Sequence, residues 1–392
     1  MTRVEVTVLD YALVNNPVPV SIVCDREGTV KMYIDLDESV IYEGSYYIPQ
    51  AIRIDISDIL KSIVSVKDSS KSYDITEQLR EYRIRIIDED SKQLFSGRYH
   101  AVWGGISKFY VRNASVGNYI EYRLANNASL STRTHGKIII LRETEITPLK
   151  VLGSPDLQIQ VVSLANHVIP CPIAPLSDTL AIHTLDISAI RKKFFSEFDE
   201  LPAYLSFLFN GILSFILVFT PGAVSANRYL LRFRNSLGCY EQLEVTGKSE
   251  LTEEMDAEDN SEYMLWDQDI MDYVTATRRK RTTSLITAET GFKDHDELMF
   301  LRDMLASDDI YLIDSSGLKS KVLVSSEDFK IPAIIEEPVS VPLKIKFADT
   351  EQSYSPNPDD GILEVYPGEW FLSRGRINAA GLVYTNNTIN TI

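Results

Sequence analysis

Histidine and cysteine are the residue types most often found in metal and catalytic centres, and their spacing in this chain matches no metal-binding pattern. No HExxH pair occurs among the histidines, which are His100, His135, His167, His183 and His295. His167 and Cys171 lie four residues apart, but Pro170 and Pro172 argue against a shared helix face that could aim both at zinc. We therefore predict no metal site.

Motifs for nucleophilic catalysis and phosphate binding are also missing from the sequence. GxSxG and the P-loop do not occur, and the pair Gly104 and Gly105 is too short to cradle a phosphate. A carboxylate pair for glycoside hydrolysis stays open as a third hypothesis, because some pair will lie close by accident in so acidic a chain. We predict no catalytic residue and no cofactor, and hence a protein that is not an enzyme.

Five aromatic residues are the candidates for an interaction surface. They are Trp103, Phe109, Tyr110, Trp370 and Phe371. The first three could stack on a sugar ring, although aromatic side chains more often serve a core or a protein interface. Trp370 and Phe371 lie where strand patterns are few, so we expect them to be held against a neighbour.

Charge excludes two classes of partner. Lys+Arg 39 against Asp+Glu 56 gives a net charge of -17, and such a field repels nucleic acid and anionic lipid. The one basic run, residues 278–281, is short and flanked by threonines, so it favours a solvated strand edge over an anion site. Asp256, Glu258 and Asn260 imitate a calcium loop, but Ser261 stands where glycine is needed, so a solvated acidic connection is favoured.

Membrane insertion and a disulfide framework are not expected. The three cysteines, Cys24, Cys171 and Cys239, are far apart, which fits synthesis in a reducing compartment. The N-terminus lacks the pattern of a signal peptide, so we expect synthesis in the cytoplasm. Residues 201–220 are almost wholly apolar, but Asn210 and Gly211 at their centre predict a buried β-hairpin rather than a transmembrane helix.

The composition predicts a mainly β chain of several domains. It is 44% hydrophobic, and its aromatic residues are mostly tyrosine, which favours strands. We predict two tandem β-sandwich-like domains, residues 1–148 and residues 149–250. The C-terminal one of the two resembles a duplicate of the other, because Leu185 to Ile190 echoes Ile54 to Ile59, and in both places a short helix and a strand hairpin follow. Chance is the competing explanation for so short an echo.

The rest of the chain changes character. We predict an acidic linker or loop at residues 251–269, and a smaller α+β domain at residues 270–350 with one helix on an antiparallel sheet. Asp294 and Glu297 have the spacing of a capping box at the start of that helix. Residues 351–392 predict a loop-rich C-terminal extension.

The clearest local pattern is a hairpin at residues 227–250, which we expect to close the second sandwich. Two alternating runs flank a turn that we predict to lie on the surface at residues 235–238. Leu231 and Phe233 should point inward, and Arg232 and Arg234 outward.

The motif from Ile54 to Ser57, the run from Arg232 to Lys248 and the run from Leu285 to Val324 together resemble uncharacterised tail or baseplate proteins of tailed phages and prophages. The resemblance implies a virion or tail-like structural subunit whose partners are itself or other tail proteins. Our leading hypothesis is therefore a non-enzymatic assembly protein. The alternative is a glycan- or ligand-binding module for host or surface recognition.

Overall fold

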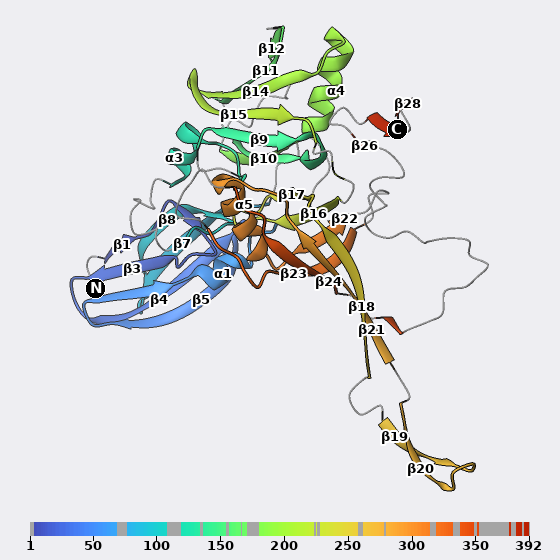
Figure 1. Ribbon diagram of the computed structural model, residues 1–392. Coiled ribbons are helices and arrows are strands. Elements are labelled where there is room, and N and C mark those ends of the chain that lie inside the picture. Colours follow the sequence, from blue (N-terminus) through green and yellow to red (C-terminus); the bar gives the residue numbers. More distant parts are fainter. Residues whose placement is uncertain are drawn as a thin grey trace. The chain divides into compact units, whose positions relative to one another are not determined.

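The structure is a computed structural model (Figure 1), and its chain is mainly β. It describes residues 4–68, 77–107, 119–133, 136–153, 157–165, 167–170, 180–222, 225, 228–257, 262–277, 280–313, 319–331, 338–348, 351–352, 376–377, 382–385 and 388–391. The chain divides into two compact units. The first comprises Met1–Ile140, Thr147–Phe219 and Asn235–Tyr240, and the second comprises Leu141–Ile146, Thr220–Arg234 and Glu241–Ile392.

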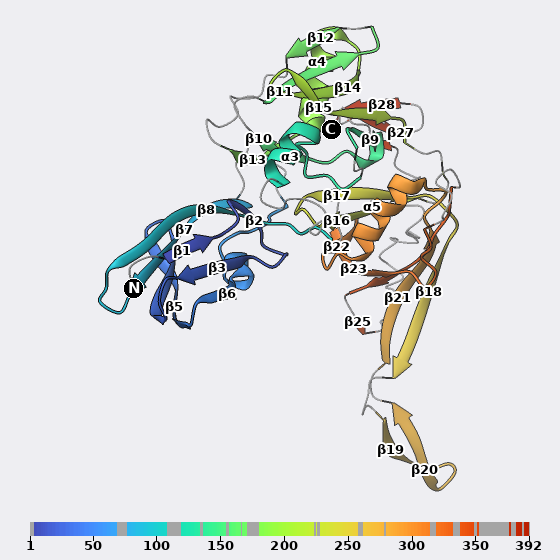
Figure 2. The ribbon, with the colours of Figure 1, turned by 90° about the vertical axis from the view of Figure 1, so that its left-hand side faces the viewer.

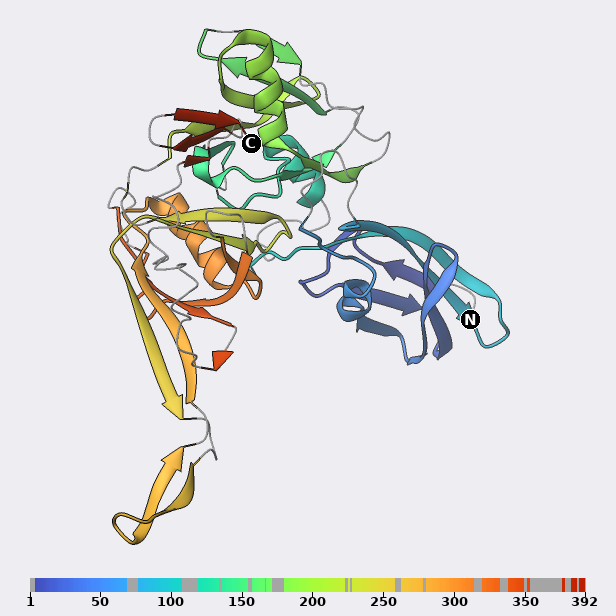
Figure 3. The same ribbon diagram turned by 90° about the vertical axis from the view of Figure 1, so that its right-hand side faces the viewer.

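The N-terminal part of the first unit is a β-sandwich (Figure 3). Its smaller sheet has the order β1 (Val4–Thr7), β3 (Pro19–Cys24), β6 (Ala51–Asp55). Its larger sheet has the order β2 (Tyr11–Leu13), β8 (Gln93–Val102), β7 (Leu79–Asp88), β4 (Gly28–Leu36), β5 (Ser39–Ile48). Val20 and Ile22 of the smaller sheet share one core with Ile34 and Ile84 of the larger, because alternate residues of each strand point inward.

A second pair of sheets repeats this order of elements. The larger sheet has the order β9 (Ile138–Arg142), β15 (Ile212–Thr220), β14 (Pro202–Phe209), β11 (Leu157–Ser163), β12 (Val168–Pro170). The smaller consists of β10 (Leu149–Gly153) and β13 (Ala181–Leu185). Taken in sequence order, the described strands from β2 to β8 correspond one to one to those from β9 to β15. Corresponding strands also have corresponding neighbours in their sheets. The two tandem sandwiches are thus present. Their origin by duplication agrees with this shared order and stays a prediction.

The echoed aspartates do similar work in the two sandwiches. The side chain of Asp186 accepts a hydrogen bond from Ala189 N at 2.9 Å and caps α4 (Ile187–Phe198). Asp55, just before α1 (Ser57–Lys61), accepts hydrogen bonds from Val18 N at 2.9 Å and Ser57 N at 3.0 Å. Burial alone would raise the pKa of Asp55, but these two hydrogen bonds, together with one from the Ser57 side chain and the nearby charge of Lys61, outweigh it and the pKa is lowered. A short helix, α3 (Tyr119–Asn126), precedes the second sandwich.

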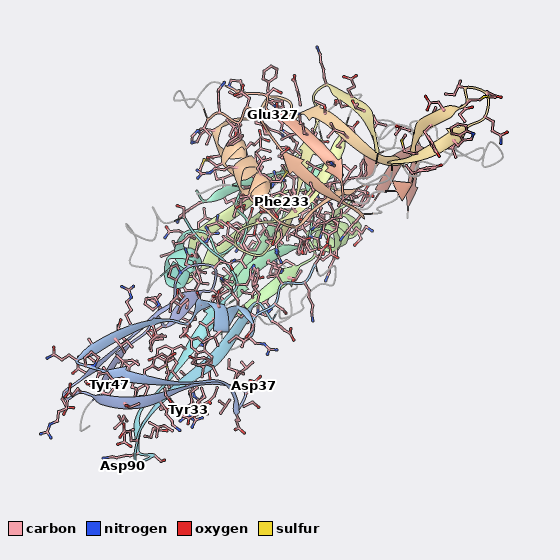
Figure 4. All side chains as sticks on the ribbon, turned by 90° about the horizontal axis from the view of Figure 1, so that it is seen from below. Tyr33, Asp37, Tyr47, Asp90, Phe233 and Glu327 are labelled. Atoms are coloured by element: carbon pink, nitrogen blue, oxygen red, sulfur yellow. The ribbon has the colours of Figure 1, made fainter. Side chains whose placement is uncertain are left out.

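The second unit contains the predicted helix on an antiparallel sheet (Figure 2). The sheet has the order β17 (Tyr240–Val245), β16 (Tyr229–Arg234), β22 (Ile310–Ile313), β23 (Lys319–Ser325), β24 (Pro342–Phe347), β21 (Lys280–Glu289), β18 (Ser249–Ala257), and β25 (Glu351–Gln352) pairs with β21. The predicted capping box is present: Glu297 N donates to Asp294 at 2.8 Å at the start of α5 (His295–Leu305). Leu298 and Phe300 of the helix pack with Phe233 of the sheet (Figure 4).

The hairpin of β16 and β17 differs from its prediction in two ways. Its strands join the helix-covered sheet rather than the second sandwich, because β16 pairs with β22. Its turn is buried except at Ser236: Asn235 is only 2% exposed, and its amide donates to Leu130 O and accepts from Cys239 N, both at 2.8 Å. Leu231 and Phe233 point inward as predicted, but Arg232 is buried rather than outward.

The expected linker at residues 251–269 is also wrong for the residues described there. Ser249–Ala257 is β18, which pairs along its whole length with β21, and Glu262–Asp267 is β19. In the expected loop-rich extension, the described residues form β25, β26 (Arg376–Ile377), β27 (Leu382–Thr385) and β28 (Thr388–Thr391).

Candidate interaction surface

Of the five predicted surface residues, only Trp103 lies in the described part of the chain. Phe109, Tyr110, Trp370 and Phe371 fall outside the described residues. Trp103 is half-buried against the core of the first sandwich, and its backbone N donates to Gln78 O at 2.8 Å. A Cβ added at Gly238 would lie 2.5 Å from its ring atom Cδ1. The ring is therefore packed against backbone on one side.

The largest group of exposed apolar side chains lies elsewhere, on a hairpin in the second unit. β19 (Glu262–Asp267) pairs antiparallel with β20 (Asp272–Thr277), and among the described strands the two pair only with each other (Figure 1). We call residues 262–277 the ribbon. Its exposed large apolar residues are Met264 at 62%, Leu265 at 49%, Trp266 at 49%, Ile270 at 60%, Met271 at 79% and Tyr273 at 58%.

The strand register sorts these side chains onto the two faces and the tip of the ribbon. Met264 lies opposite Thr275 and Trp266 opposite Tyr273, which places all four on one face. The Trp266 and Tyr273 rings meet edge to face, with centroids 5.0 Å apart, and the Thr275 hydroxyl points its proton at the Met264 sulfur 3.9 Å away. These contacts hold the four side chains together on one face of the ribbon.

The tip of the ribbon combines apolar and acidic groups. Asp267 and Asp272 lie directly opposite each other, an arrangement in which like charges repel. Asp267 accepts a hydrogen bond from Asp269 N at 2.9 Å, which shapes the turn. Ile270 and Met271 follow, and Met271 has a φ of 50°, a conformation that side chains with a Cβ disfavour.

Physically, a ribbon of this kind is suited to binding rather than to catalysis. An isolated two-stranded hairpin is only marginally stable in water, and it gains stability when one face is packed. Contiguous exposed apolar surface of this kind marks a site of association. The ribbon offers aromatic and Met side chains, the residue types enriched at the centre of protein interfaces.

A cluster of charges is buried in the second unit, and it has a structural explanation. Arg228 Nε lies 2.8 Å from Glu244 Oε1, with the two side chains 5% and 0% exposed. Arg142 reaches Glu297 at 3.1 Å, and Glu145 Oε1 accepts from Glu244 N at 2.8 Å. These contacts bind the segment Leu141–Ile146 to the sheet of its own unit. Because Arg228 and Glu244 are buried and paired with each other, removing either one would cost about 3–5 kcal/mol.

The described residues offer neither a metal centre nor a membrane-spanning helix. No group of three or more His, Cys, Asp or Glu residues there is arranged to hold a metal ion. None of the described helices is both long and apolar enough to span a bilayer. The apolar segment at residues 201–220 is the predicted hairpin of β14 and β15, with Asn210 and Gly211 at its turn.

Sequence reasoning missed the residues of the ribbon. The whole of β19 falls within the predicted acidic linker at residues 251–269, because that prediction rests on the charge of the stretch and not on its apolar residues. The signal was present nonetheless, because Tyr263 to Trp266 and Tyr273 to Val274 are apolar runs on either side of a short acidic turn, the pattern of a hairpin.

Comparison with known proteins leaves the chain without an assigned family. No protein family matches the sequence, and no curated protein matches it. Among solved structures, the chain is similar to one described as a marsupial T cell receptor, with 9% sequence identity over 72% of this chain and 96% of that one, at a TM-score of 0.18. A likeness at that TM-score carries no argument about fold or function.

Proposed function

We propose that this chain is a non-enzymatic structural protein of a phage-tail-like particle and that it assembles through the ribbon. The observation that carries the assembly role is the group of exposed apolar residues on β19 and β20, with Trp266 and Tyr273 at its centre. The particle is suggested by the resemblance of residues 54–57, 232–248 and 285–324 to tail and baseplate proteins.

The energetics of the ribbon support an assembly role. Burial of one large apolar side chain is worth about 1.5–3 kcal/mol, so covering several of the exposed ones on the ribbon contributes substantially against the entropy cost of association. Left bare, the same side chains invite aggregation. We therefore expect a partner to cover the ribbon once the particle is assembled.

The test is to make the ribbon polar while leaving its backbone intact. The double variant Trp266→Ser/Tyr273→Ser should lose self-association and capture by other components of the particle. Light scattering after size-exclusion chromatography measures the first, and a pull-down with each neighbouring gene product measures the second. Leu164→Ser is the matched control, since Leu164 is 89% exposed but lies in a turn far from the ribbon in the sequence.

Two outcomes would contradict the proposal. One is a parent protein that stays monomeric at high concentration and captures no particle component. The other is a double variant that associates as well as Leu164→Ser. Reproducible glycan-array binding that survives Trp266→Ser/Tyr273→Ser would favour the recognition module instead.

A further inference from the structure

A basic and partly apolar surface lies on the outer face of the helix-covered sheet. Along β23 and β24 every second residue points to the α5 side: Val322, Leu343 and Ile345 are buried there. The residues between them face outward, and Leu323 is 60% exposed. We call the surface formed by Leu285, Lys319, Lys321, Leu323, Lys344 and Lys346 the lysine face.

The strand register brings these residues into adjacent rows. Lys346 lies opposite Leu323 on one side and opposite Leu285 on the other. Lys321 lies 4.8 Å from the centroid of the Tyr311 ring, within cation–π distance. Four lysines on two neighbouring strands are unusual in a chain with a net charge of -17.

Part of this positive charge remains available to a partner. Lys321 pairs with Asp309, and Lys344 pairs with Glu327, which is labelled in Figure 4. Lys346 is exposed and forms no ion pair with another residue in the described part of the chain. Leu323 supplies apolar area beside it.

The ribbon and the lysine face are complementary in chemistry. The ribbon carries Asp267, Asp269 and Asp272 around exposed apolar residues, and the lysine face carries lysines around Leu323 and Leu285. Opposite charges flanking apolar contacts set the orientation of a contact and suppress wrong partners. A lipid surface fits the ribbon less well, because aspartates are costly to bury in a bilayer.

We propose that the ribbon of one copy packs on the lysine face of a second copy. This proposal rests on the proposed function and names the partner of the same surface. The contact joins two different surfaces, so an open assembly keeps one free ribbon at one end and one free lysine face at the other until it closes. Repetition of such a head-to-tail contact gives a ring when the rotation closes and a helical filament when it does not.

The test uses two variants that each disable one half of the contact. In the ribbon variant, Trp266→Ser and Ile270→Ser remove apolar side chains, and in the face variant, Leu323→Ser and Lys346→Glu change the lysine face. All four residues are exposed, and thermal unfolding checks that both variants remain folded. Light scattering after size-exclusion chromatography then gives the mass of each protein alone and of the 1:1 mixture.

The expected results are specific to a head-to-tail contact. The parent forms oligomers, and each variant alone has a dissociation constant raised about tenfold or more. The mixture forms a dimer that does not grow, since one intact ribbon meets one intact face. A mixture that stays monomeric, or two variants that assemble like the parent, overturns the proposal.

Charge reversal gives a second and independent readout. Asp269→Lys/Asp272→Lys and Lys319→Glu/Lys346→Glu should each weaken association of the otherwise unaltered chain. A mixture of the two should associate more tightly than either alone, because the reversed charges again oppose each other. Absence of that recovery overturns the assignment of these two surfaces to each other.

Failure of this inference can be told apart from failure of the proposed function. If the parent is monomeric but Trp266→Ser/Tyr273→Ser abolishes capture by another particle component, self-docking is overturned and the assembly role stands. If that double variant matches Leu164→Ser in both assays, both are overturned. Trp266-dependent flotation with neutral phosphatidylcholine vesicles would overturn the inference in favour of a lipid surface.

Discussion

Two apolar hairpins of this chain, β14–β15 and the ribbon, have opposite environments. Both carry an aromatic pair at directly opposite positions, Phe207 with Phe215 and Trp266 with Tyr273. The phenylalanines are 0% exposed and stack with centroids 4.0 Å apart, whereas Trp266 and Tyr273 are 49% and 58% exposed. Apolar content alone therefore does not decide which hairpin is buried.

Neighbouring strands account for the difference. β14 is flanked by β11 and β15 by β9, so the hairpin lies within a five-stranded sheet and one face forms a core with the rest of the sandwich. The two strands of the ribbon have no further partner among the described strands. The same aromatic pairing serves a core in the first case and a surface ready for a partner in the second.

Charge distinguishes the two hairpins in the sequence. Residues 201–220 contain no charged side chain, whereas the ribbon has Asp267, Asp269 and Asp272 at its turn. Acidic groups at the tip keep an exposed apolar hairpin soluble and discourage random edge pairing. An apolar hairpin with a charged turn is thus a signature of a binding element, and an uncharged one is a signature of a core.

The strongest test of this contrast compares one aromatic deletion in each hairpin. Phe215→Ala should lower the free energy of unfolding by about 3–5 kcal/mol, because it leaves a cavity against Phe207. Trp266→Ala should change it by less than about 0.5 kcal/mol in dilute protein, because half of that side chain is already in water. Urea unfolding at low concentration measures both.

The effects of the two substitutions on self-association should be the opposite of their effects on unfolding. Trp266→Ala weakens self-association, whereas Phe215→Ala leaves it intact in conditions where the variant is folded. Equal losses of unfolding free energy in the two variants would show that the ribbon is packed like the core hairpin, and the contrast would fail.

A smaller effect is expected at the two turns. Gly211 has a φ of 74° with nothing within 4 Å of an added Cβ, so Gly211→Ala should destabilise the second sandwich by about 1 kcal/mol through backbone conformation alone. Met271 has a φ of 50°, so Met271→Gly should stabilise the turn of the ribbon by a similar amount.

Hydrogen exchange of the amides in each hairpin measures these changes separately. Protection should fall in β14 and β15 for Gly211→Ala and rise in β19 and β20 for Met271→Gly. Faster exchange in the ribbon of Met271→Gly would mean that the Met271 side chain holds the turn through contacts that outweigh its backbone strain.

Local signals in the sequence were sufficient for much of the fold. The capping box at Asp294 and Glu297 located α5, and Asn210 with Gly211 located the turn of β14 and β15. These features depend on residues a few positions apart, which a sequence displays directly. The alternation that sends Leu231 and Phe233 inward is equally local.

Long-range partners could not be predicted in the same way. The turn at Asn235 is buried because it bonds to Leu130, and Gln78 Nε2 donates to Leu237 O at 2.5 Å, across 159 residues of sequence. The pairing of β16 with β22 likewise joins segments whose sequences carry no mark of each other. The polar residues of the turn at residues 235–238 therefore predicted a surface position, whereas contacts with residues distant in the sequence bury most of it.

The candidate surface was missed for a related reason. Net charge was weighed over the whole stretch of residues 251–269, and its acidic average concealed the exposed Met264, Leu265 and Trp266. The apolar run from Tyr263 to Trp266 is the local feature that this average hides. Which copy or partner covers the ribbon depends on surfaces elsewhere, and these become visible only when the sheet brings Leu323 and Lys346 together.

The last and smallest expected effect uses pH to separate the two regions. The sandwich that contains β14 and β15 also contains His183, whose side chain is buried and whose Nε2 has no hydrogen-bond partner in the described structure, whereas the ribbon contains no histidine. Burial lowers the pKa of His183 from its ordinary 6.5. Well above pH 6.5 the ring is neutral in both folded and unfolded chains, so its titration has no effect on stability there.

As the pH falls below 6.5, the unfolded chain takes up a proton that the folded chain resists, so this sandwich loses stability until the folded pKa is reached. His183→Gln should therefore flatten the dependence of the unfolding free energy on pH between about 7 and 5. Urea unfolding across that range, with protection of the ribbon amides followed in parallel, measures the difference. If the unfolding free energy of parent and variant depends equally on pH, the titrating group is not His183. If the ribbon amides lose protection over the same pH range, the two regions respond together.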